Sequence, residues 1–148
     1  MRRFRFALQG LEKMRQARVD EARLTLARSQ GAQRAEEELI MNLGQEIENT
    51  AAEATRDDIL DMTELLEEQR YTGELRRRRA DALERLEGWI AVVEGDRQRL
   101  IKASQEHKAL ERLRERRYLE FVQDVLREEG QITDEVASTG DWRRRKEA

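Results

Sequence analysis

Apolar residues recur at intervals of three and four along almost the whole of this 148-residue chain, without ever gathering into a long run. Leu26, Leu43 and Ile47 belong to this stripe in the first third, and Leu86 and Leu100 belong to it further on. Such spacing marks one face of an α-helix, and so narrow a stripe is typical of helices that pair as a coiled coil. Charged residues make up 41% of the chain, which is too many for a thick globular core because buried charges must be paired.

The stripe breaks near Thr55 and Asp57, either of which can cap a new helix. We expect a first helix over about 4–53, a turn over about 54–57 and a second helix over about 57–137. Gly130 and Gly140 mark where the second helix is expected to fray into a basic C-terminal tail. Two helices joined by a short turn fold back on each other. The sequence therefore predicts an all-α fold, a long antiparallel two-helix coiled-coil hairpin with unequal arms, forming a single domain over 1–148.

The second helix is expected to turn a weakly apolar seam toward the first. His107, Leu110 and Leu113 follow one another at intervals of three, which is a phase shift within the stripe. The expected seam positions before that shift are Met62, Leu66, Gln69, Gly73, Arg76, Ala80, Leu83, Leu86, Ile90, Val93, Arg97, Leu100, Ser104 and His107.

The residue types needed for catalysis or metal binding are sparse. The chain has no cysteine, and its one histidine, His107, falls on the seam and is expected to be an interior polar residue. Its eight glycines form no phosphate-binding loop. We therefore predict no enzyme activity, no catalytic residue, no cofactor and no metal site. No stretch of 18 consecutive apolar residues occurs, so we expect a cytoplasmic protein without membrane insertion.

Four consecutive arginines occupy positions 76–79. Consecutive helical residues lie 100° apart, so these side chains point around the axis and do not form one cationic face. Opposite charges four residues apart accompany them, which indicates a solvated helix and disfavours nucleic-acid binding. The expected pairs are Glu74–Arg78, Arg77–Asp81 and Asp81–Arg85.

A less compensated basic cluster forms if the chain turns near residue 55, because the N-terminal arginines then lie beside those at 112–117. Docking onto an acidic protein surface is the functional interpretation, and simple solvation, with Glu111 and Glu115 offsetting part of the charge, is the alternative. The cluster comprises Arg2, Arg3, Arg5, Arg112, Arg114, Arg116 and Arg117.

Tyr71 and Leu75 lie one helical turn apart and out of register with the expected seam. An exposed aromatic and aliphatic pair on a charged helix is a candidate partner contact. A stray surface pair without function is the alternative.

Four stretches of the sequence resemble the FliJ family of flagellar type III export proteins. They are FRFALQGL (4–11), RAEEELIMNL (34–43), WIAVVEGDRQRLIKASQEHKALERLRERR (89–117) and ITDEVAS (132–138). The resemblance implies an antiparallel two-helix coiled coil, similar to the central stalk of rotary ATPases. It further implies a non-catalytic protein at the inner face of the cell membrane that binds and stimulates the hexameric export ATPase FliI by the end holding the termini.

The resemblance also implies contact with the cytoplasmic domain of the export-gate protein FlhA, and escort of export chaperones by some members. Tyr71, Leu75, Arg78 and Ala82 match the family's gate-contact stripe, although Arg78 replaces a small residue.

Three alternatives to this function stay open. The first is the equivalent stalk of a virulence injectisome, the second is a structural coiled coil that associates with itself, and the third is a nucleic-acid binder. A stalk-like hairpin is expected to be monomeric alone, which separates it from the second alternative.

Overall fold

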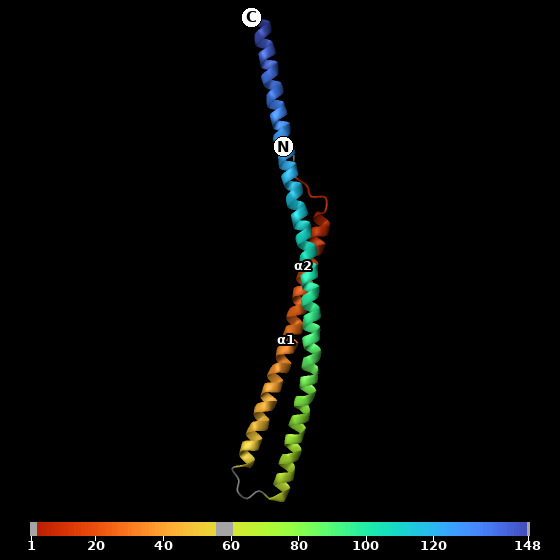
Figure 1. Cartoon of the computed structure of the whole chain (residues 1–148), viewed down its shortest axis with the longest axis vertical. Coiled ribbons are helices and arrows are strands. Elements are labelled where there is room, and N and C mark those ends of the chain that lie inside the picture. Colours follow the sequence, from red (N-terminus) through yellow and green to blue (C-terminus); the bar gives the residue numbers. More distant parts are fainter. Residues whose placement is uncertain (1–2, 56–60, 148) are drawn as a thin grey trace. The chain divides into compact units, whose positions relative to one another are not determined.

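Two helices account for nearly all of the described structure. A computed structural model describes residues 3–55 and 61–147, apart from the side chains of residues 143, 144 and 147. Helix α1 spans Gln9–Ala54 and helix α2 spans Met62–Glu147, and the described residues contain no strand (Figure 1). The two helices pack against each other, so the predicted all-α helical hairpin is confirmed.

The start of α1 lies five residues later than expected. Residues 3–6 have no regular secondary structure, and the Gln9 N–H donates a hydrogen bond to the Phe6 carbonyl at 3.1 Å. Glu12 lies in the first turn, where a carboxylate favours the positive end of the helix dipole. The N-terminal segment is therefore irregular over residues 3–6 and a turn at residues 7 and 8, whereas the sequence alone predicted helix from residue 4.

The connection between the helices begins at Thr55. The Thr55 hydroxyl donates to the carbonyls of Ala51 at 3.3 Å and Ala52 at 2.9 Å, so it satisfies the end of α1 and does not cap α2. The expected helix start at Asp57 lies outside the described residues. Asp61 precedes α2, and the carboxylate of Glu64 accepts from the Asp61 N–H at 3.4 Å, which is one half of a capping box.

Helix α2 continues through both glycines at which fraying was expected, and that expectation is wrong. Gly130 and Gly140 lie within the helix, which ends at Glu147, and no described glycine has a positive φ. A helical glycine costs up to about 1 kcal/mol relative to alanine, but it does not by itself break the backbone hydrogen bonding. The surrounding residues are therefore sufficient to carry the helix to Glu147.

The chain divides into two compact units. The hairpin unit consists of residues 19–102, and the terminal unit consists of residues 1–18 together with 103–148. Each unit contains a stretch of α1 and a stretch of α2. The prediction that all 148 residues form one domain stays a prediction.

The hairpin unit is held by a narrow seam that runs along both helices. Its buried apolar side chains are Val19 and Leu43 on α1, and Leu75, Ala82 and Val93 on α2. The helices run antiparallel, because Glu46 contacts Tyr71 while Glu36 contacts Arg85. The buried and half-buried positions of α2 recur at intervals of four and three, except for one interval of seven that spans the exposed Arg79. They are Glu68, Thr72, Leu75, Ala82, Leu86, Trp89, Val93, Asp96 and Leu100.

The predicted seam of α2 is confirmed at Leu86, Val93 and Leu100. At its other positions the seam lies one residue earlier than predicted, at Glu68, Thr72, Leu75, Ala82, Trp89 and Asp96. The predicted seam positions Leu83 and Ile90 are 44% and 49% exposed, whereas Leu75 is 2% exposed and Ala82 is fully buried. The expected phase was wrong because its middle held Gln69, Gly73 and Arg76, which carry little apolar surface. Trp89 is half-buried beside the exposed Ile90.

The seam also contains polar side chains. Ser29 and Asp96 are buried, and the Ser29 hydroxyl donates to the Leu26 carbonyl at 3.0 Å. The Asp96 carboxylate accepts from the Arg99 guanidinium at 2.9 Å. Among the described residues, no buried side-chain nitrogen or oxygen lacks a hydrogen-bond partner. A seam with satisfied polar groups but few large apolar side chains gives a modest stability to the hairpin unit.

Candidate protein-docking surfaces

An aromatic cluster holds the N-terminal segment against α2 in the terminal unit. The Phe4 ring meets Tyr118 edge to face, with centroids 5.4 Å apart, and lies 5.7 Å from the Phe121 ring. An edge-to-face aromatic pair contributes about 0.5–1.5 kcal/mol of stability beyond the contribution of the surface that it buries. Sequence reasoning did not single out Phe4, although the alternation of arginine and phenylalanine over residues 3–6 was a usable signal.

The packing of Phe4 brings two N-terminal arginines to α2. Arg3 and Arg5 line a groove together with Arg117, Glu120 and Asp124. Further along the same helices, Arg114 donates to Glu12 at 3.2 Å, and Arg15 pairs with Glu106. The structure therefore places part of the predicted basic cluster together, while Arg2 lies outside the described residues.

The remaining arginines of the cluster point in other directions. Arg112 and Arg116 are exposed and form no ion pair within the described part of the chain. They lie one turn apart and about 100–140° around the helix from Arg117. Arg117 itself donates to Glu120 at 3.0 Å. The cluster thus wraps around α2, and Arg112 and Arg116 are its uncompensated charges.

The terminal unit has a clear excess of positive charge over residues 3–18 and 103–118. These two stretches contain ten lysines and arginines but only four glutamates. We call the six described arginines of this region the basic surface: Arg3, Arg5, Arg112, Arg114, Arg116 and Arg117.

The second candidate surface lies on α2 in the hairpin unit. Tyr71 is 47% exposed, and its hydroxyl donates a hydrogen bond to the Glu46 carboxylate, which raises the pKa of Tyr71 above its ordinary value. Arg78 is exposed and donates to Glu74 at 3.3 Å. Leu75 and Ala82 are buried in the seam, so the expectation of an exposed Tyr71 and Leu75 pair is wrong for Leu75.

Two arginines of the run at 76–79 pair with the same carboxylate. Arg77, which was expected to pair with Asp81, lies 3.9 Å from Glu74. The predicted pair of Glu74 with Arg78 is present at 3.3 Å. Arg85 was expected to pair with Asp81, but it donates instead to Glu36 on α1, at 2.9 and 3.3 Å. Its hydrogen bond to Glu36 raises the pKa of Arg85. This bridge links the two helices, so charge contributes to the pairing of the hairpin unit as well as to its solvation.

Neither His107 nor the carboxylates of the described residues form a recognisable metal site. His107 is half-buried, as are Leu110 and Leu113, and its Nδ1 atom lies 3.7 Å from the Glu111 carboxylate. Within residues 3–55 and 61–147, no three His, Cys, Asp or Glu side chains gather in a way that could hold a metal ion. The described helices include none that is both long and apolar enough to cross a membrane.

This geometry defines a protein of two long paired helices with a charged surface. The family described as flagellar FliJ protein matches residues 4–146. The chain therefore belongs to the FliJ family, and it is a structural component of flagellar type III protein export. No curated protein and no solved structure matches the chain.

Proposed function

We propose that this chain is a non-catalytic, stalk-like coiled coil that binds the hexameric export ATPase FliI and stimulates its turnover. The observation that carries the proposal is the excess of ten basic over four acidic residues in the two stretches of the terminal unit. Family membership and the helical hairpin support it.

The basic surface acts in this proposal by docking onto carboxylates of the ATPase. Exposed charges increase the rate of encounter and set the orientation of docking, and salt screens them over about 8 Å at physiological ionic strength. Arg112 and Arg116 contribute most, because Arg114 and Arg117 already have carboxylate partners at 3.2 and 3.0 Å. Hydrolysis chemistry belongs to the ATPase, and this chain promotes its assembly and turnover.

We further propose that α2 contacts the cytoplasmic domain of the export-gate protein FlhA. Tyr71 and Arg78 are the exposed members of the candidate stripe and would touch the gate directly. Leu75 and Ala82 are buried and would hold this stretch of α2 in place against α1. The chain would thereby connect the ATPase to the gate at the inner face of the cell membrane, and would escort export chaperones as some relatives do.

The test is ATP turnover by the flagellar export ATPase of the same organism, measured with and without the purified chain. Stimulation is expected, and it should fall on charge reversal of Arg112 and Arg116 to Glu. Arg76→Glu with Arg77→Glu is the matched control, because it also reverses two exposed arginines and both lie in the hairpin unit. Turnover and co-elution that the chain leaves unchanged would contradict the ATPase proposal. Equal losses for the control would show that net charge, and not the basic surface, is responsible.

A further inference from the structure

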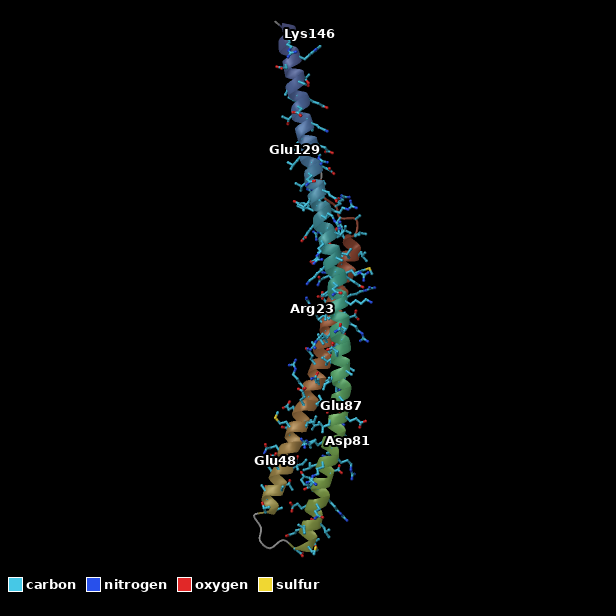
Figure 2. All side chains as sticks on the ribbon, in the orientation of Figure 1. Arg23, Glu48, Asp81, Glu87, Glu129 and Lys146 are labelled. Atoms are coloured by element: carbon cyan, nitrogen blue, oxygen red, sulfur yellow. The ribbon has the colours of Figure 1, made fainter. Side chains whose placement is uncertain are left out.

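Helix α2 carries an exposed apolar face after Phe121. Ile132 and Val136 are 61% and 67% exposed, and Val122 and Val125 are half-buried. Figure 2 shows side chains of this part of the terminal unit, including the labelled Glu129, projecting from α2, and no other described segment of that unit lies beside Glu129. Large apolar side chains gathered on an exposed face commonly mark an interaction site.

The spacing of these residues is that of a coiled-coil seam. Val122, Val125, Glu129, Ile132 and Val136 follow one another at alternating intervals of three and four, so they stay within about 80° of the helix circumference. The first part of this face borders a groove. The groove is lined by Phe121, Val122, Val125, Leu126, Glu128, Glu129 and Ile132. We call the face formed by the five residues 122, 125, 129, 132 and 136 the distal seam.

The distal seam continues an interface that already exists. Phe4 of the N-terminal segment packs on Tyr118 and Phe121, directly before Val122. A helix laid on the distal seam would therefore extend the line of apolar contacts that Phe4 begins. The geometry of the site is that of a helix packing on a helix.

The charge around the distal seam is opposite to that of the basic surface. Residues 119–141 contain seven carboxylates and a single basic residue, Arg127, which lies 3.7 Å from Asp124. Asp124, Glu128 and Glu135 lie along one edge of the seam, about 100° from its centre, while Leu119 and Leu126 lie along the other. The partner must accordingly present positive charge at one edge of its own apolar stripe.

A second copy of this chain does not meet that requirement. An antiparallel pair of distal seams would set Glu128 of one copy beside Glu135 of the other, and a parallel pair would set the two Glu129 carboxylates against each other in the seam. Like charges in facing positions destabilise a helix pair, so the charge pattern disfavours association between copies.

We propose that the distal seam is a docking site for a basic amphipathic helix of a partner protein. Apolar side chains of that helix would pack on Val125, Ile132 and Val136, while its lysines or arginines would face Glu128 and Glu135. Because this site is acidic and the basic surface requires an acidic partner, the chain offers two docking sites of opposite charge within the terminal unit. The proposal stands independently of the contact with the ATPase.

The test uses the full chain and a synthetic amphipathic helical peptide with leucine at its core heptad positions and lysine at its flanks. Binding is followed by fluorescence anisotropy, and a peptide with glutamate flanks is the comparison. The lysine peptide should bind and the glutamate peptide should not. Ile132→Asn should weaken binding by at least about tenfold, as loss of a central anchor does at other interfaces. The double change Glu128→Lys and Glu135→Lys should transfer the preference to the glutamate peptide.

The matched control reverses Asp134 and Asp141, which lie roughly 150° from the centre of the distal seam. This control should leave the preference unchanged, and Arg112→Glu with Arg116→Glu should leave binding of the lysine peptide intact. Three results would overturn the proposal: equal binding of both peptides, equal effects of the two pairs of acidic reversals, or a dimer in light scattering that Ile132→Asn abolishes. The last result would make a second copy the occupant.

Discussion

The register of the seam makes a sharp prediction, because Leu75 and Leu83 are the same residue type on different faces of α2. Leu75 is 2% exposed and Leu83 is 44% exposed. Removing three carbon atoms from a fully buried leucine costs about 2–3 kcal/mol at roughly 0.8 kcal/mol per methylene. The added cost of a cavity should be small, since a two-helix seam can close partly around the site. We therefore expect Leu75→Ala to lower the free energy of unfolding by about 2–3 kcal/mol.

The same substitution at Leu83 should cost only about 1 kcal/mol, because nearly half of that side chain is already in water. Urea unfolding followed by far-UV circular dichroism measures both values, and the slopes of the two transitions should agree with that of the unchanged chain. Both variants keep a residue with high helix propensity, so propensity contributes equally to each. A larger loss for Leu83→Ala would refute the observed register and restore the seam expected from the sequence.

Three further outcomes follow from the described contacts. Tyr71 should titrate at a higher pH than an ordinary tyrosine, and Glu46→Gln should return it toward that value in an ultraviolet absorbance titration. Because the pKa of Tyr71 is raised in the folded protein, its hydrogen bond to Glu46 stabilises the fold fully at pH values below the ordinary tyrosine pKa. This stabilisation is lost as the pH rises through the raised pKa of the folded protein. Gly130→Ala should strengthen α2 by up to about 1 kcal/mol in thermal unfolding, since nothing lies within 4 Å of the added carbon. Phe4→Ala should release residues 3–8, seen as faster amide hydrogen exchange there, while the hairpin unit is unaffected.

Local patterns in the sequence determined the secondary structure and much of the charge chemistry. The recurrence of apolar residues at three and four predicted two helices with a break near residue 55, and the described helices end and begin around that break. The pair of Glu74 with Arg78 was also predictable, since both residues belong to one helix and lie one turn apart. Membership of the FliJ family could be predicted from the sequence as well, because it depends on the order of such local patterns along the chain.

The tertiary structure decided which face of α2 meets α1. Two faces one residue apart carried similar and weak apolar patterns, so the sequence of α2 alone did not separate them. Leu75 and Ala82 became buried while Leu83 stayed exposed, and the bond from Arg85 to Glu36 joins residues 49 positions apart. The phase of a helix pair depends on what the partner helix presents across the seam, and periodicity within one helix carries no information about its partner. Packing of Phe4 on Tyr118 and Phe121 is likewise a long-range contact, and it places the N-terminal arginines beside α2.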